Sequence, residues 1–174
     1  MFLVTAPSLV TVGNNMFTFR GNVGKIIREL GALTLGPNSI YKKAGEQLKD
    51  QLLEEFDSLV RETPQWTGTT AASWEIGFPN SISGDVETQP ERTRVEALQK
   101  GAEPACSIAT RKARTSLTGD FKKIATQDII VANSAPGFET AEEGPVRPDN
   151  TPPGALSRFE GRVAAMEIEV DFYK

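Results

Sequence analysis

The fold is decided by residues 63–78, which read TPQWTGTTAASWEIGF. Pro64 lacks a backbone N–H and disfavours helical geometry at Thr63, so a helix that reaches this point has to end. The Thr-Gly pair at 67–68 is a tight-turn signal. Apolar and polar residues then alternate, which predicts a strand over 74–78. The stretch therefore predicts a corner between a helix and a strand. A plain connection with core aromatics accounts for it, because none of its residues forms a reactive constellation.

The helix that reaches this corner is the longest in the chain and is predicted from about Asn38 to Arg61. Its apolar residues recur at spacings of three and four, which places them on one stripe: Tyr41, Gly45, Leu48, Leu52, Phe56 and Leu59. The other face carries the i,i+4 pairs Lys42/Glu46 and Asp57/Arg61, each worth about 0.2–0.5 kcal/mol. The stripe has to be buried against a sheet or another helix.

The remaining elements are predicted from shorter patterns. A strand over 16–20 precedes a short helix over 22–30, and 81–87 is a candidate hairpin partner for the strand at 74–78. Thr88-Gln89-Pro90-Glu91 resembles a capping box that opens a modest helix ending near Gly101. A further helix is predicted within 104–118, with Ile108, Ala109, Ala113 and Leu117 on one face. The nearly continuous apolar run 128–133 predicts a central strand. A final helix is predicted over 155–166, and the tail 166–174 fits helix and strand periodicities equally.

These elements predict an α+β fold, in which a small antiparallel or mixed sheet packs against a long helix and two or more shorter helices. Residues 1–15 are predicted to form an N-terminal arm or an edge strand, and residues 16–174 a single domain. Residues 139–154 are rich in Pro, Gly and acidic residues, which predicts a long exposed loop. Such a loop is either a binding segment or plainly disordered.

Composition restricts the functions that the chain can have. The 174 residues include 19 Lys+Arg and 23 Asp+Glu, a net charge of −4 that disfavours wrapping nucleic acid as the main task. The absence of His removes Ser-His-Asp and Cys-His catalysis and most zinc sites. Cys106, the single cysteine, is predicted to be a buried thiol. No apolar run or signal-peptide pattern indicates a membrane segment. We expect a soluble protein made in a reducing cytosol.

Catalytic and cofactor motifs are absent from the sequence. It contains no P-loop, Rossmann glycine fingerprint, Cys/His array or GxSxG turn. Acidic pairs such as Glu142-Glu143 lack the spacing of a calcium loop, so no metal, cofactor or catalytic residue is predicted. A small hydrolase using clustered carboxylates remains an alternative, and it would require two acids of displaced pKa in one concave pocket.

Arg111, Lys112 and Arg114 form a small basic cluster on the helix predicted within 104–118. A solvated helix face is the simplest interpretation. The alternatives are contact with DNA phosphates or with an acidic partner subunit. A nucleic-acid-binding module acting through these residues would bind DNA with strong salt dependence.

The order of several motifs along the chain resembles the tail-completion or head–tail joining proteins of long-tailed bacteriophages. In that family a short strand, Gly and short helix precede a long helix, which ends in a Thr-Pro…Thr-Gly…Ser-aromatic corner, similar to 63–74. A strand ending in Asn follows, then an aromatic residue and Glu-x-Gly, similar to 129–133, Phe138 and 142–144. A Pro-x-Gly step, similar to 152–154, leads into a final helix. Two positions depart from the family pattern: Trp66 replaces an acid, and Gly137-Phe138 replaces a Tyr. The resemblance covers about residues 16 to 166.

The resemblance implies a structural protein of the virion neck, made in the host cytoplasm and without catalysis. It implies a homo-oligomeric ring, usually of six copies, between the head connector and the tail tube. DNA would pass through the channel without sequence-specific binding, which an acidic lumen favours. The runner-up is a tail terminator that caps the tube. A closed ring needs two different surface patches on each subunit. We expect the tryptophan corner or the loop 139–154 to supply one of them, through Trp66, Trp74, Phe138, Glu142, Glu143 and Pro152.

Deletion of residues 140–152 is therefore predicted to leave a folded monomer that no longer assembles. Circular dichroism would verify the fold, and joining of purified heads to tails would measure assembly. A deletion variant that still joins heads to tails would exclude the loop as an assembly element.

Overall fold

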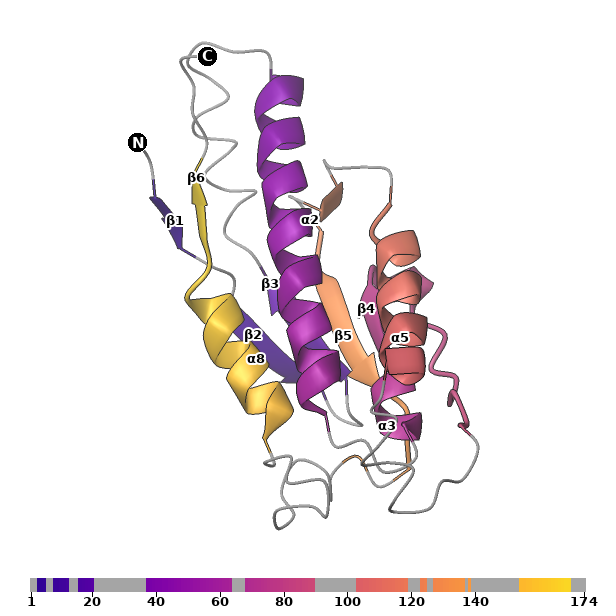
Figure 1. Cartoon of the computed structure of the whole chain (residues 1–174). Helices are drawn as coiled ribbons and strands as arrows, with labels where there is room; N and C mark the ends of the chain where they lie inside the picture. The colour runs from indigo at the N-terminus through magenta and orange to yellow at the C-terminus, as the bar shows by residue number, and fades with distance from the viewer. Residues whose placement is uncertain are drawn as a thin grey trace.

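The computed structural model (Figure 1) describes residues 3–5, 8–12, 16–20, 37–63, 68–89, 103–118, 123–124, 127–136, 138 and 154–169. Its strands are β1 (Leu3–Thr5), β2 (Ser8–Val12), β3 (Met16–Arg20), β4 (Trp74–Gly77), β5 (Ile129–Asn133) and β6 (Glu167–Glu169). Its helices are α2 (Pro37–Glu62), α3 (Thr69–Ala72), α5 (Glu103–Ser116) and α8 (Ala155–Ala164), with a 3₁₀ turn, η1, at Pro79–Ser81. The predicted α+β class is confirmed.

The main sheet has four strands in the order β2-β3-β5-β4, and every neighbouring pair is antiparallel. The predicted central strand is confirmed, because β5 lies between β3 and β4 and all five of its residues are buried. β2 forms one edge, which agrees with the edge-strand alternative for the N-terminal residues. β1 pairs with β6 in a separate two-stranded sheet. Residues 167–169 of the tail are thus a strand.

A layer of three helices lies on one side of the main sheet, with α2 between α8 and α5 (Figure 1). The predicted stripe explains the place of α2, because Leu48, Leu52, Phe56 and Leu59 are all buried. Its opposite face carries the two predicted ion pairs, Lys42–Glu46 and Asp57–Arg61. The strands β4 and β5 contribute side chains to the same hydrophobic core as this stripe. Ile76 of β4 lies opposite Val131 of β5, and both belong to the same core.

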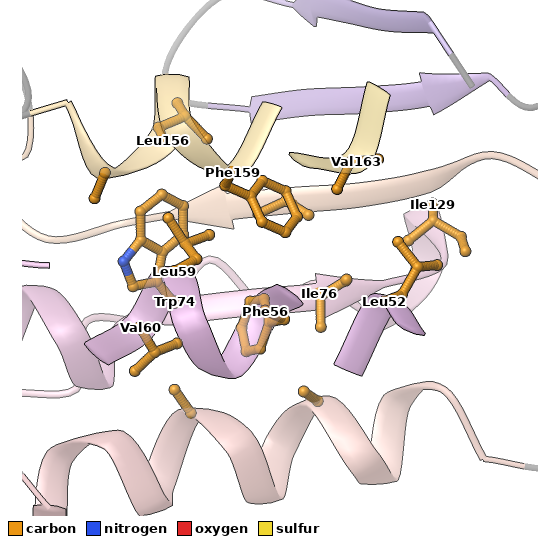
Figure 2. Packing of buried hydrophobic residues seen from close by; sticks show 14 of the residues in the cluster. Leu52, Phe56, Leu59, Val60, Trp74, Ile76, Ile129, Leu156, Phe159 and Val163 are labelled. Carbon is orange, nitrogen blue, oxygen red and sulfur yellow. The ribbon is translucent and has the colours of Figure 1, made fainter. Parts of the chain in front are cut away.

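The two flanking helices contact the core with side chains of different sizes. α8 contributes Leu156, Phe159 and Val163, which point toward the α2 side chains in Figure 2. α5 contributes small residues, among them Ala105, Ala109 and Ala113, together with Leu117. Small residues allow two helix backbones to approach closely, so α5 can pack tightly against both α2 and β4. Cys106 lies on this buried face, as predicted.

The chain after β4 departs from the prediction. Residues 81–87 do not form a hairpin strand: Ser81 ends the η1 turn, and residues 82–89 contain no regular structure. Side-chain hydrogen bonds, described below, replace the ladder bonds that a hairpin would have made. The helices predicted at 22–30 and after 88–91 lie outside the described residues, as do 139–153 of the predicted loop.

Two glycines allow turns that other residues would strain. Gly68 has φ 88°, in the left-handed region that glycine adopts readily, and Thr67 of the expected turn lies outside the described residues. At Gly77 an added Cβ would lie 2.3 Å from Ser81 Oγ and 2.9 Å from Ser116 Cβ. Strand β4, the turn η1 and the end of α5 therefore meet at Gly77 without room for a side chain.

Phe56→Ala is predicted to lower the free energy of unfolding by about 3–5 kcal/mol, because Phe56 is fully buried at the centre of the helix layer. Urea denaturation followed by circular dichroism would measure the change. Lys43→Ala on the exposed face of the same helix is the control and should change stability by less than about 0.5 kcal/mol. Equal losses in the two variants would contradict the burial of the α2 stripe.

Candidate functional site

The corner at the end of α2 is held by a threonine hydroxyl that is fully buried. Thr63 Oγ1 donates a hydrogen bond to the Leu59 carbonyl at 2.8 Å, and it accepts one from the Trp74 indole Nε1 at 2.7 Å. One hydroxyl thus satisfies a carbonyl of the last helical turn and the N–H of a buried tryptophan. The end of α2 and the start of β4 are joined without any exposed group.

Asn133 connects the end of β5 to the same corner. Its side-chain Nδ2 donates to the Thr70 carbonyl in α3 at 2.8 Å, and its Oδ1 accepts from the Ala135 N–H at 2.9 Å. Asn133 lies directly opposite Trp74 in the sheet register and is buried. Phe138 packs edge-on against Trp74, with ring centroids 5.1 Å apart and planes at 87°. The helix end, α3, β4, β5 and the aromatic residue after β5 therefore meet in one place.

Residues 82–89 cross this region and are held by side chains from α3 and β4. Glu75 is almost fully buried; its carboxylate accepts hydrogen bonds from Ser83 Oγ at 2.6 Å and from the Gly84 N–H at 2.9 Å. The hydroxyl of Ser73 accepts from the Glu87 N–H at 3.0 Å. The hydroxyl of Thr69 accepts from the Gln89 N–H at 3.1 Å. These side-chain oxygens therefore accept hydrogen bonds from backbone N–H groups that would have bonded to a neighbouring strand in a hairpin.

The predicted assembly residues divide into two groups. Trp74 and Phe138 are described, and both are buried in the corner, so neither presents a side chain to a partner. They can act on an interface only by supporting the backbone around them. Trp66, Glu142, Glu143 and Pro152 lie outside the described residues.

The predicted basic cluster is split by the structure. Lys112 forms an ion pair with Glu87, which ties α5 to residues 82–89. Arg111 and Arg114 instead are exposed and line a groove of about 480 Å³ along the seam between α2 and α5. Its other lining residues are Asp57, Arg61, Ser107, Thr110, Thr115 and Thr118.

An adjoining hollow of about 670 Å³ continues this groove toward the start of α2, where Lys49, Asp50, Leu53 and Glu54 join the lining. The two hollows share Asp57, Arg61, Thr110, Arg114 and Thr118. We call the combined surface the α2–α5 groove. It brings together an acidic wall from α2 and a basic wall from α5, which lie about sixty residues apart in the sequence.

An ion-pair network between α2 and α8 was not predicted from the sequence. Glu62 accepts from Arg158 Nε at 2.7 Å and from Arg162 Nη1 at 2.9 Å. Arg162 also pairs with Glu55. The i,i+4 spacing of the two arginines and the i,i+7 spacing of the two glutamates are the signals that could have indicated it.

Little in the described residues points to acid–base or metal chemistry. Burial, not a neighbouring carboxylate, raises the pKa of the Glu160 carboxyl above its usual range, and Glu160 does not line the α2–α5 groove. The described part of the chain contains no group of three or more His, Cys, Asp or Glu side chains placed to hold a metal ion. Within the same residues, no helix combines the length and the apolar character that crossing a membrane requires.

Comparison of the chain with protein-family models, with curated proteins and with solved structures finds no match.

Thr63→Val is predicted to lower the free energy of unfolding by about 1–3 kcal/mol, because it leaves the buried Trp74 N–H without an acceptor. Thr63→Ser keeps the hydroxyl and is the control. Urea denaturation followed by tryptophan fluorescence would compare the two. In a double-mutant cycle with Trp74→Phe, the paired loss should be smaller than the sum of the single losses. A Thr63→Ser variant as unstable as Thr63→Val would show that packing, and not this hydrogen bond, holds the corner.

Proposed function

We propose that this chain is a structural subunit of the neck of a tailed bacteriophage virion, and that copies of it form a ring joining the head connector to the tail tube. The ring would enclose the channel through which DNA leaves the head. In this proposal the chain has a structural role and no catalytic activity.

The observation that carries the proposal is the meeting of the resembling motifs in space. Thr63 closes the long helix, Trp74 opens a strand, and Asn133, which is 70 residues after Thr63, ends another strand. Hydrogen bonds place the first two residues together and tie the third to α3 of the same corner. Phe138 completes it by packing on Trp74. Each motif alone is weak support for the resemblance. These residues of different motifs nevertheless lie together in one buried cluster, as we expect if the chain shares the architecture of that family.

The position of the corner also supports an assembly role for the segment that follows it. Residues 139–153 begin immediately after Phe138, which is fixed against Trp74, and end immediately before Gly154, which precedes α8. Both ends of this Pro/Gly-rich segment are therefore attached to the rigid core. A segment anchored in this way can reach a neighbouring subunit while the domain keeps its fold.

The overall charge is compatible with a DNA channel. A net charge of −4 disfavours adhesion of a phosphate backbone, so DNA can slide past such a protein. Closure into a ring requires each subunit to present two different patches. In this proposal the α2–α5 groove and residues 139–153 supply these two patches.

The purified protein is predicted to form rings with a central hole. Light scattering would give the mass in solution, and negative-stain images of the same sample would give the symmetry. Six copies of an 18.9-kDa chain weigh about 113 kDa. If the chain is monomeric, the same measurements would be repeated with purified head connector rings. A chain that forms no ring alone and binds neither connector nor tail tube would exclude the proposed function. Capping of free tail tubes without binding to connectors would instead favour a terminator.

A further inference from the structure

The α2–α5 groove is built from two matched helical stripes. Its α2 wall carries Asp50, Glu54, Asp57 and Arg61, and its α5 wall carries Ser107, Arg111 and Arg114, followed by Thr118 just after the end of the helix. Each set has the spacing i, i+4, i+7, i+11, so each occupies one face of its helix. Both helices are fixed by the core on their other faces. The core therefore fixes the backbones of both helices, and with them the positions from which the charged side chains of the groove extend.

Arg111 and Arg114 supply guanidinium donors to this groove. Arg61 is already bonded to Asp57, at 2.7 Å between Nε and Oδ2. The hydroxyls of Thr110, Thr115 and Thr118 donate to carbonyls of the preceding helical turn, so their protons are used within α5. Arg111 and Arg114 are exposed and have no ion-pair partner among the described residues. Two guanidinium groups three residues apart suit carboxylate ligands.

The α2 wall argues against DNA as the ligand. Duplex DNA presents about one negative charge per 1.7 Å of its axis, and a phosphate backbone lying in the groove would face Asp50, Glu54 and Asp57. A protein segment with a few carboxylates can place them at the arginines and leave the acidic wall to neutral or basic groups. The mixed walls therefore favour an acidic peptide.

The chain itself contains an acidic segment of this kind. Residues 139–143 read ETAEE, and no basic residue follows until Arg147. The segment begins directly after Phe138, which is fixed in the core. Copies with a net charge of −4 repel one another at long range, and locally opposed charges at a contact offset this repulsion. The arginines of the groove and the carboxylates of this segment supply such a pair.

We propose that the α2–α5 groove of one copy binds residues 139–143 of a second copy, with Arg111 and Arg114 pairing with carboxylates of Glu139, Glu142 and Glu143. The contact uses two different surfaces, so it is head-to-tail and can close into a ring. The inference deepens the proposed neck function and rests on it for the ring. The contact itself can be tested separately.

Two charge-reversed chains test the contact. R111E/R114E makes the groove acidic, and E139K/E142K/E143K makes the segment basic. Each variant alone then opposes like charges, and self-association measured by sedimentation velocity should weaken at least about a hundredfold. An equimolar mixture restores opposite charges at every groove, so assembly should return in the mixture. R111Q/R114Q is a milder variant and should weaken association less than R111E/R114E does.

The matched control is K42E/K43E, which changes the net charge as much as R111E/R114E does but alters two lysines of α2 that do not line the groove. It should associate like the wild-type chain. Circular dichroism of every variant checks that the domain is folded. Higher salt should weaken association of the wild-type chain.

Several outcomes would overturn the inference. These are wild-type chains that do not associate, R111E/R114E chains that associate normally, and a K42E/K43E control that loses association equally. Restoration only when both sets of reversals are on one chain would place the contact within a single copy. Binding of a labelled DNA duplex that is lost in R111E/R114E would assign the arginines to DNA. Rings that persist in R111E/R114E would leave the neck function standing without this contact. Association that returns in the mixture but never closes into rings would support this contact and contradict the proposed neck function.

Discussion

The structure depends on the hydrogen bond between the Trp74 indole and the Thr63 hydroxyl, which is buried from solvent and 2.7 Å long. A buried indole N–H needs an acceptor, and a helix that stops before a proline needs a partner for its last carbonyls. Thr63 meets both needs, because its hydroxyl also donates to the Leu59 carbonyl. This contact joins the last turn of α2 to the first residue of β4, on the side of α2 that carries its apolar stripe.

The rest of the core is arranged around α2. α2 lies between α8, which packs with large side chains, and α5, which packs with small ones (Figure 2). The seam with α8 is closed by the Glu62, Arg158 and Arg162 ion pairs. The seam with α5 is left open as the α2–α5 groove. The two seams of α2 therefore differ, because ion pairs bridge one of them and the other carries the groove. Residues 82–89 are held separately, against β4 and the end of α3, because buried Glu75 and the hydroxyl of Ser73 accept hydrogen bonds from their backbone and side-chain donors.

Much of the fold could be predicted because local patterns and burial agree. The α2 stripe and the final helix have a strong helical period, the central strand is a nearly continuous apolar run, and all three are confirmed. The hairpin at 81–87 was wrong because a buried carboxylate and two hydroxyls satisfied that segment in place of a strand. The pattern of apolar residues along the sequence does not indicate which side chains accept such hydrogen bonds, so this arrangement could not be predicted from it. The candidate site was predicted in part. The basic cluster was found, but the pairing of Lys112 with Glu87 and the acidic wall facing Arg114 depend on residues far away in the chain.

The sequence by itself determined the α+β class, the length and buried face of α2, the break at Pro64 and the buried state of Cys106. These properties depend on neighbours a few residues apart, which is the range over which proline geometry and helical or strand periods act. Only the tertiary structure decided that Thr63, Trp74, Asn133 and Phe138 share one corner. It also decided that Arg111 and Arg114 face carboxylates of α2 across a groove. Contacts of that kind depend on how the helices and strands pack against one another. The free energy that favours one packing arrangement comes from burial of the whole core, so it cannot be read from any single segment of the sequence.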